Sequence, residues 1–318
     1  MTTTVFIDGE SGTTGLQIRT RLEGRSDIQL LHADTEKRKE QTERRRWLNE
    51  ADIVVLCLPD DGARQAVTMI ENPRAKVLDA SSAHRVAPGW VYGFPELLPD
   101  QADRIREAQR VTNPGCYPTG ALALVRPLVD AGLLPKGYPL CVHALSGYTG
   151  GGRKMIDAYQ AGSHDPVRLY ALELTHKHVP EMHLYSGLTH RPLFCPEVGN
   201  FAQGMLVQIP LHAVSLPKRA SGKEYYRVLS EYYASRRFIE VVPFDISPIP
   251  HLAPEALNGT NRMELFVFEG ASDGHLLLVA RLDNLGKGAS GAAVQNIDLM
   301  IGLESKSDYA LPAGTQSR

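Results

Sequence analysis

Short apolar runs alternate with amphipathic or polar stretches through the first third of the chain. Four runs rich in aliphatic and β-branched residues have the composition of strands, and they lie at residues 4–9, 27–33, 51–59 and 75–81. Three stretches between them have helical spacing or a polar composition, and they lie at residues 16–24, 36–50 and 61–72. This alternation is typical of βαβ units and predicts an α/β fold with a doubly wound parallel sheet.

Apolar patterns continue beyond that region. Residues 119–134, TGALALVRPLVDAGLL, have a helical pattern, and YPLCVHAL at residues 138–145 has the pattern of a strand. Near the carboxyl end, AVQNIDLMIGLES at residues 293–305 is again apolar with helical spacing. A chain of 318 residues with 43% hydrophobic composition is long enough for two domains, because domains commonly span about 100–200 residues.

The charge balance excludes several classes of partner. The chain has 34 Lys and Arg residues against 36 Asp and Glu residues, so neither nucleic acid nor a membrane surface is an expected partner. The basic run EKRKEQTERRR is interrupted by acids and indicates a solvated helix face or a local phosphate site. The first 20 residues lack a signal-peptide pattern and no stretch has the length of a membrane span, so we expect a cytoplasmic protein.

Four cysteines are too few for a disulfide framework in a chain of this length, and none has the CxxC spacing of a zinc site. We therefore expect no metal. Cys57, Cys141 and Cys195 lie in strand-like or apolar segments and are interpreted as core residues. The fourth, Cys116, has a different setting.

A glycine-rich turn follows the first predicted strand. GESGTTG has the spacing G-x-x-G-x-x-G, which differs from the common G-x-G-x-x-G of dinucleotide sites, and it precedes an amphipathic stretch. It is either a nucleotide site, where the helix start binds a pyrophosphate, or an ordinary tight turn. As a nucleotide site it assigns cofactor binding to Gly9, Ser11, Gly12, Thr13, Thr14 and Gly15.

The choice of cofactor is left open by the residues after the second predicted strand. Asp34 suits the ribose hydroxyls of NAD, whereas Lys37, Arg38 and Lys39 could neutralise the additional phosphate of NADP.

Cys116 lies in NPGCYPTG, between a Pro-Gly turn and the predicted helix. A helix start lowers the pKa of a thiol and makes it a better nucleophile, and Pro118 fits the first turn of a helix. The pattern indicates a reactive cysteine, with a helix-packing cysteine as the alternative.

Histidines gather in THKHVPEMH. His176, His178 and His183 lie there with Lys177 and Glu181, and acid–base work by one of them is the favoured interpretation. Metal binding by the His-x-His pair is the other interpretation. The loop ALSGYTGGGRK ends in Arg153 and Lys154, which suits an anionic substrate as well as a plain surface loop.

Together these segments resemble a known family. GESGTTG, LDASSAHR, YGFPEL, NPGCYPTG, SGYTGGGR, KHVPE, VGNFAQGM and DNLGKGASGAAVQN, in this order, are similar to the shorter type of N-acetyl-gamma-glutamyl-phosphate reductases of arginine biosynthesis. The resemblance covers nearly the whole chain. It implies NADPH-dependent reductive dephosphorylation of N-acetyl-gamma-glutamyl phosphate to N-acetyl-glutamate 5-semialdehyde through a cysteine thioester.

The resemblance also implies a fold related to aspartate-semialdehyde dehydrogenase and glyceraldehyde-3-phosphate dehydrogenase. A Rossmann domain would comprise residues 1–116 with a return segment, 284–318, and a catalytic domain with a mixed sheet would comprise residues 117–283. The mixed sheet would also form the interface of a homo-oligomer, either a dimer or a tetramer. The small-molecule acyl phosphate is the expected partner.

The resemblance assigns roles to individual residues. The nucleophile falls on Cys116 and the general base falls in KHVPE. We favour His176 for proton transfer and His178 for substrate binding, although spacing alone does not rank the two histidines. The implied substrate contacts are Ser82, Arg85, Asn113, Arg153 and Glu181. The implied cofactor contacts, beyond the glycine turn, are Lys37, Arg38, Pro59, Asn284 and Lys287, and they favour NADP, although Asp34 departs from that preference.

Two other functions fit the same features. Aspartate-semialdehyde dehydrogenase has the same thiol chemistry and fold, and a non-catalytic NADP-binding sensor would need only the glycine turn and a redox-sensitive thiol.

Overall fold

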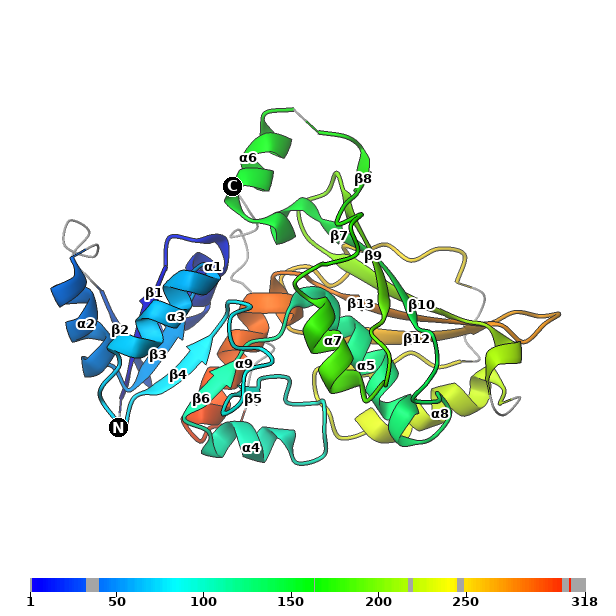
Figure 1. Cartoon of the computed structure of the whole chain (residues 1–318), viewed down its shortest axis with the longest axis horizontal. Coiled ribbons are helices and arrows are strands. Elements are labelled where there is room, and N and C mark those ends of the chain that lie inside the picture. The colour runs from blue at the N-terminus through cyan, green and yellow to red at the C-terminus, as the bar shows by residue number, and fades with distance from the viewer. Residues whose placement is uncertain are drawn as a thin grey trace. The chain divides into compact units, whose positions relative to one another are not determined.

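The computed structural model of the chain describes residues 2–32, 40–162, 164–216, 220–244 and 249–304, together with residue 309. The described residues divide into two compact units. The first takes its residues from Met1–Pro114 and Ala289–Ala313, and the second takes its residues from Gly115–Gly288. Each unit is built on its own sheet (Figure 1).

The first unit contains a six-stranded sheet in the order β2-β1-β3-β4-β6-β5, and every neighbouring pair is parallel. This confirms the predicted parallel sheet. Its strands are β1 (Thr3–Asp8), β2 (Ile28–Leu31), β3 (Ile53–Leu56), β4 (Lys76–Asp79), β5 (Val91–Tyr92) and β6 (Arg110–Thr112). The strands predicted at 4–9, 27–33, 51–59 and 75–81 are the first four of these. Strand β1 starts one residue earlier than its run, and β2, β3 and β4 are shorter than theirs.

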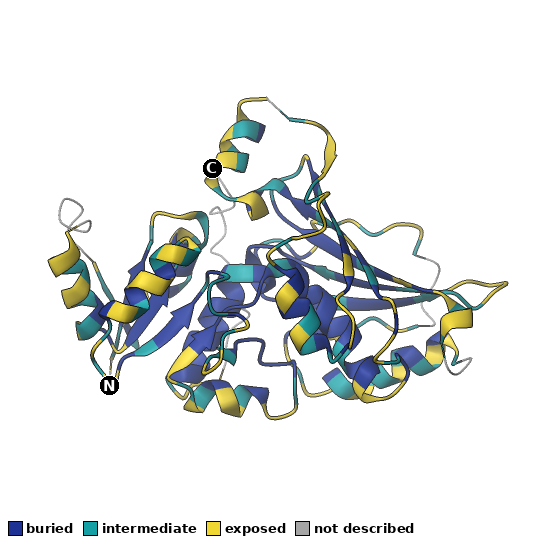
Figure 2. Cartoon of the chain, viewed as in Figure 1, coloured by how far each residue is buried: buried dark blue, intermediate teal, exposed yellow. Residues whose placement is uncertain are grey.

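Helices pack on this sheet through their apolar residues. The helices of the first unit are α1 (Thr13–Leu22), α2 (Gln41–Glu50), α3 (Asp60–Met69), α4 (Gln101–Glu107) and α9 (Gly291–Met300). Leu48 of α2 and Ala63 of α3 form one cluster with Phe6 and Val54 of the strands. Helix α9 contacts α1, α4 and β4, and all of its residues are buried, which explains why its sequence is apolar (Figure 2).

The glycine turn sets the start of α1 three residues before the predicted helix. Gly9 has φ +91°, a conformation that a side chain would strain, and its carbonyl accepts the N–H of Gly12 at 3.0 Å. An ideal Cβ on Gly15 would lie 2.5 Å from the carbonyl oxygen of Gly9. Glycine at position 15 is therefore required for the helix to pass this close to the turn.

The second unit contains a seven-stranded sheet in the order β11-β12-β13-β10-β7-β9-β8. Its strands are β7 (Cys141–Gly147), β8 (Val167–Leu169), β9 (Leu193–Gly199), β10 (Met205–Leu211), β11 (Ile239–Val241), β12 (Met263–Glu269) and β13 (Leu276–Leu282). The pairs β7–β9 and β11–β12 are parallel and the other pairs are antiparallel. The sheet is mixed, as the resemblance implied.

One helix dominates the covered face of this sheet. Helix α5 (Cys116–Asp130) contacts β10, β13, α7 (Val179–Ser186) and α8 (Gly222–Tyr233). An ideal Cβ on Gly120 would lie 2.8 Å from the Val207 side chain, so this glycine lets α5 approach the sheet closely. The helix was predicted at 119–134. It begins instead at Cys116, which makes the cysteine part of its first turn.

The loop predicted around the three glycines is more ordered than expected. Tyr148–Gly151 form a 3-10 helix, and α6 (Arg153–Gln160) begins directly after Gly152, whose φ is +74°. Among the residues described, no helix combines the length and the apolar character needed to cross a membrane.

Replacing Gly15 by Ala should destabilise the first unit, because the new methyl group meets backbone atoms that cannot rotate away. We expect a loss of about 1–3 kcal/mol in free energy of unfolding, measured by denaturant titration without cofactor. Gly12→Ala is the matched control, since its Cβ meets the Gly9 oxygen at 3.4 Å, an ordinary contact. Equal losses in the two variants would contradict the steric explanation.

Candidate active site

Cys116 is the first residue of α5, with Gly115 as the N-cap, and its side chain is half-buried. Helix starts carry a partial positive charge that favours a thiolate. Pro118 has no N–H, and the N–H of Thr119 donates to the Gly115 carbonyl at 3.0 Å. The N–H of Tyr117 also lies in the first turn of the helix, and no carbonyl of the helix accepts it.

Two contacts fix the position of Cys116. An oxygen of the Glu181 carboxylate accepts the N–H of Gly115 at 3.0 Å, and the Glu181 side chain is buried in α7. On the other side, an ideal Cβ on Gly288 would lie only 2.7 Å from the Cβ of Cys116. The resemblance assigned Glu181 to substrate binding, and the structure gives its carboxylate a contact that positions the cysteine turn.

The two histidines of KHVPE lie beside the residue that follows the cysteine. Their ring centroids are 4.7 Å apart, and they lie 6.1 Å (His176) and 5.8 Å (His178) from the ring of Tyr117. The third histidine of the motif, His183, is near the end of α7. The structure thus brings Cys116, His176 and His178 into one region of the second unit. Their spacing in the sequence did not predict this proximity.

A hydrogen bond defines the tautomer of His176. Its Nδ1 accepts the backbone N–H of His178 at 3.1 Å. A neutral imidazole has one protonated nitrogen and one acceptor nitrogen, so the proton of neutral His176 lies on Nε2. In this arrangement Nε2 of His176 is a hydrogen-bond donor.

Two tyrosines in this region were missed by the sequence interpretation. The hydroxyl of Tyr170 donates to that of Tyr117 at 3.1 Å, and the Tyr117 hydroxyl donates to the carbonyl of Glu197 at 3.2 Å. Burial raises the pKa of both tyrosines, and proximity to Cys116 raises the two pKa values further. Both phenols are therefore neutral at working pH and act through hydrogen bonds. Tyr117 lies within NPGCYPTG, so its position next to Cys116 in the sequence could have indicated that it belongs to the site.

Asn284 and Lys287, assigned to the cofactor by resemblance, are engaged within the second unit. The Asn284 amide donates to the Thr149 hydroxyl at 3.0 Å and accepts the Gly204 N–H at 2.9 Å. The Lys287 side chain is fully buried, with its ammonium 5.3 Å from the ring centroid of Phe238. Asn284 therefore ties the 3-10 helix to the loop before β10.

The predicted phosphate contacts of the first unit also have partners there. The Ser82 hydroxyl donates to the carboxylate of Asp60 at 2.9 Å. The buried Arg85 guanidinium donates to the carbonyl of Asn113 at 3.0 Å and to that of Ala80 at 3.4 Å. Arg85 thus supports the first residue of NPGC.

Asn113 and Arg153 differ in exposure. The Asn113 amide donates to the Ala289 carbonyl at 2.9 Å and is buried. The Arg153 side chain is 81% exposed at the start of α6 and pairs with Asp157 at 2.9 Å. Because this ion pair is at the surface and contributes little, the guanidinium can exchange Asp157 for a ligand at small cost.

The glycine turn has the features of a pyrophosphate site. Gly12 is the N-cap of α1 and offers no side chain to cap it, so the first N–H groups of the helix are available to a ligand. Ser11, Thr13 and Thr14 lie in or beside this turn, and Pro59 is the N-cap of α3 at the end of β3. Asp34, Lys37, Arg38 and Lys39 lie outside the described residues, so the structure does not rank NAD against NADP.

Comparison with known proteins gives matches over most of the chain. A semialdehyde dehydrogenase NAD-binding domain model matches residues 4–105, and a semialdehyde dehydrogenase dimerisation domain model matches residues 116–284. N-acetyl-gamma-glutamyl-phosphate reductase of Burkholderia lata is 53% identical over 94% of this chain and 96% of its own length. N-acetyl-gamma-glutamyl-phosphate reductase 2 of Pseudomonas putida is 52% identical over 95% of this chain and 97% of its own length.

The chain belongs to the N-acetyl-gamma-glutamyl-phosphate reductase family. It is an oxidoreductase that reduces the acyl phosphate with NADPH to N-acetyl-glutamate 5-semialdehyde and phosphate, in arginine biosynthesis.

Solved structures support the same fold. Aspartate semialdehyde dehydrogenase II of Vibrio cholerae, complexed with ASA, covers 95% of this chain and 99% of its own with a TM-score of 0.70 and 14% identity. Aspartate semialdehyde dehydrogenase of Candida albicans, solved with NADP, has a TM-score of 0.63 at 14% identity, over 95% of this chain and 99% of its own. At this identity the likeness concerns the fold alone.

Removing the carboxylate of Glu181 tests its positioning role. Glu181→Ala leaves the buried N–H of Gly115 without this acceptor, at a cost of about 1–3 kcal/mol in free energy of unfolding. We also expect slower alkylation of Cys116 by iodoacetamide and a lower kcat with little change in KM. Glu181→Gln retains an amide oxygen and should behave nearly like the parent chain. If the Gln and Ala variants lose equal stability and activity, the negative charge of Glu181 and not its hydrogen bond positions the cysteine turn.

Proposed function

We propose that Cys116 performs the family reaction as the nucleophile, through a covalent thioester. The observation that carries this is the placement of a half-buried thiol in the first turn of α5, with the histidine pair beside the adjacent Tyr117. A thioester accepts hydride whereas a carboxylate does not, so covalent capture divides one difficult reduction into two easier steps.

The first step forms the thioester. The sulfur of Cys116 bonds to the acyl carbon, the bond between that carbon and the phosphate oxygen breaks, and inorganic phosphate leaves with the electron pair. The thiol proton passes to a histidine. The N–H of Tyr117 donates to the oxyanion that develops on the acyl oxygen, because it points out of the first helical turn.

Bound NADPH supplies the hydride that reduces the thioester carbon. The oxyanion on that carbon then re-forms its carbonyl and expels sulfur, which releases the semialdehyde. The protonated histidine returns its proton to the departing sulfur and restores the thiol of Cys116. The phenols of Tyr117 and Tyr170 stay neutral and hold the surrounding hydrogen bonds fixed.

The tautomer of His176 favours the opposite assignment of proton transfer and substrate binding to the one expected from the sequence. Because His176 donates from Nε2, it suits a substrate oxygen or the developing phosphate, and we assign it to substrate binding. We assign proton transfer to His178, which lies nearer to the ring of Tyr117.

For the anionic substrate we propose Arg153 as the first contact, since it lies in the same unit as Cys116 and its ion pair is exposed. Ser82, Arg85 and Asn113 are proposed as further contacts of the acyl phosphate. The buried contacts of Arg85 with backbone carbonyls favour a second role in supporting the turn.

For the cofactor we propose that the glycine turn binds the pyrophosphate through the bare N–H groups at the start of α1. Lys37 and Arg38 are proposed to select NADP through its additional phosphate. Asn284 is proposed to hold the 3-10 helix against the nicotinamide end of the site, and Lys287 to act from the core by supporting that loop.

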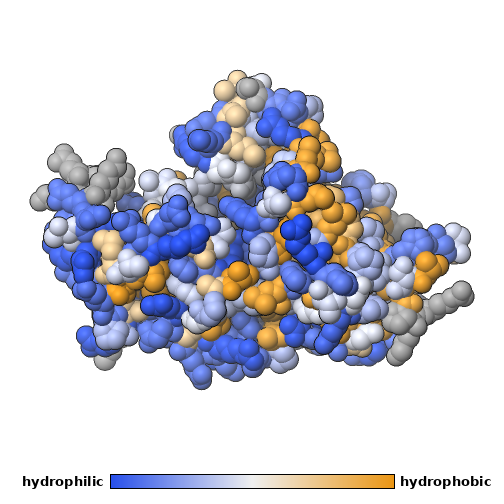
Figure 3. Space-filling view, in the orientation of Figure 1, coloured by the Kyte–Doolittle hydropathy of each residue, from blue (hydrophilic) through white to orange (hydrophobic). Residues whose placement is uncertain are grey.

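We further propose a homo-oligomer, either a dimer or a tetramer. The second unit matches a dimerisation domain, and it exposes large apolar side chains around β8, β9 and α7, namely Val167, Leu169, Leu172, Leu184 and Leu193. Figure 3 shows apolar side chains gathered on one face over β9 and its neighbours. A cytoplasmic location is proposed because the reaction needs NADPH and a reduced thiol.

The thioester is tested by mixing the chain with N-acetyl-gamma-glutamyl phosphate without NADPH. Mass spectrometry should find the N-acetylglutamyl group on Cys116. Cys116→Ser should fold normally, form no acyl adduct and lose more than about 99% of activity, in line with the large losses seen when a nucleophile is removed. Retention of a tenth of the activity, or an adduct elsewhere, would exclude Cys116. NADP binding without any turnover would instead support the sensor function.

Glutamine substitutions separate the two histidines, because a Gln amide can replace a donating Nε2–H but cannot accept a proton. We expect His178→Gln to lower kcat by about 10²–10⁴-fold and to remove the limb of the pH–rate profile due to the base. His176→Gln should raise KM and keep a larger share of kcat. The opposite pattern would assign proton transfer to His176.

A further inference from the structure

The sheet of the second unit has one covered face and one face that turns away from α5. Val207 packs on Gly120 of α5, so it points to the covered face. It pairs with Ala144 in the neighbouring strand, and Gln208 pairs with His143. Successive side chains of a strand point to opposite faces, so His143 and Gln208 lie on the face away from α5.

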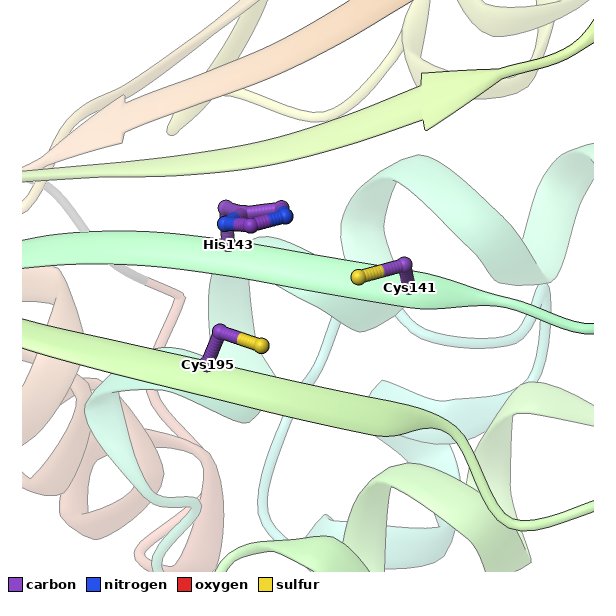
Figure 4. A group of neighbouring side chains, drawn as sticks. All are labelled: Cys141, His143 and Cys195. Carbon is purple, nitrogen blue, oxygen red and sulfur yellow. The ribbon is translucent and has the colours of Figure 1, made fainter. Parts of the chain in front are cut away.

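Two cysteines lie on that same face beside His143. Cys141 is two residues earlier on β7, and Cys195 is the direct neighbour of His143 across the parallel pair β7–β9. Figure 4 shows the two thiols directed toward each other, with the imidazole beside them. The sequence interpretation placed both cysteines in a core, but both are half-buried and His143 is exposed.

The distances fit a metal ion. The two sulfur atoms and a ring nitrogen all lie within 4.8 Å of one another. In a tetrahedral zinc site with Zn–S near 2.3 Å and Zn–N near 2.0–2.1 Å, neighbouring ligand atoms are about 3.5–3.8 Å apart. The three side chains would therefore have to move closer together on binding an ion.

We propose that Cys141, His143 and Cys195 bind one zinc ion, with water as the fourth ligand. Two thiolates and an imidazole are the soft and borderline donors that zinc prefers, whereas calcium and magnesium prefer oxygen ligands. The ion would join β7 to β9 on the open face of the sheet. Neither the proposed reaction nor its site residues use these three side chains.

A zinc ion suits the charge of this cluster, because two thiolates balance the two positive charges of the ion. Glu197, two residues after Cys195 and half-buried on the same face of β9, adds negative charge nearby.

This site could not be found from spacing in the sequence. Cys141 and His143 are separated by one residue, but Cys195 lies 54 positions after Cys141 and joins them only through strand pairing. Zinc sites recognised from sequence have short intervals between ligands.

Cobalt is the probe, because it takes the same geometry as zinc and its thiolate complexes have visible and near-ultraviolet absorption. The full-length Cys116→Ser chain is used after reduction, so that the catalytic thiol cannot bind the probe. We expect one cobalt ion per chain, a tetrahedral spectrum with a charge-transfer band of two thiolates, and full displacement by one equivalent of zinc.

Three variants on this background identify the ligands. Cys195→Ser and Cys141→Ser should each weaken cobalt binding by more than about 100-fold, beyond the roughly 10- to 100-fold cost of losing an outer-shell partner. His143→Gln replaces an exposed side chain that the fold does not need, and it should weaken binding while preserving the two-thiolate band at saturation. Circular dichroism spectra and reductase activity with Cys116 restored should match the parent for all three.

His275→Ala is the matched control. The rings of His212 and His275 are 4.1 Å apart, and they form a second imidazole pair that could attract the probe. We expect this variant to bind cobalt like the parent. The proposal is overturned if the reduced parent shows no thiolate band, if the band survives Cys195→Ser, or if His275→Ala removes it. Formation of a Cys141–Cys195 disulfide in preference to the complex, under the same reducing conditions, would also overturn it.

Discussion

The hydrogen bond from the Gly115 N–H to the Glu181 carboxylate is the constraint on which the reactive centre depends. It ties the residue just before Cys116 to a buried side chain of α7, and α7 in turn packs on α5. With the turn held, Gly288 can approach the cysteine from the other side without a Cβ in the way. The result is a thiol in the first turn of a helix, where backbone groups are still available to bind charge.

The segment that supplies Glu181 also supplies His176 and His178. The position of Cys116 and the protonated nitrogen of His176 therefore depend on the same segment. His178 is the N-cap of α7, and its backbone N–H is directed back to His176. The hydrogen bond of a helix start therefore defines which nitrogen of His176 carries a proton. A short motif thus positions the proposed nucleophile through a carboxylate and presents a donor through an imidazole.

Much of the fold could be predicted because it depends on local patterns. The buried parallel strands are continuous apolar runs, and the glycine turn is required by the close approach of Gly15 to Gly9. The Pro-Gly turn indicated that Cys116 lies at a helix start, although the helix starts three residues earlier than the pattern indicated. Contacts between distant segments could not be predicted. The role of Glu181, the partners of Asn284 and the pairing of Cys195 with His143 depend on strand and helix packing that no local pattern encodes.

The two faces of the mixed sheet carry different kinds of side chain, because successive residues of a strand point to opposite faces. On the covered face, Val207 and Ala144 are small or branched because α5 must pack closely through Gly120. On the other face, Cys141 and His143 occupy alternate positions of the same strand and point away from α5. Because β7 carries both sets of side chains, its backbone connects the residues under α5 with the cysteine–histidine cluster. A ligand that orders β7 and β9 would therefore stabilise β10, which pairs with β7 and on which α5 packs, without contacting Cys116.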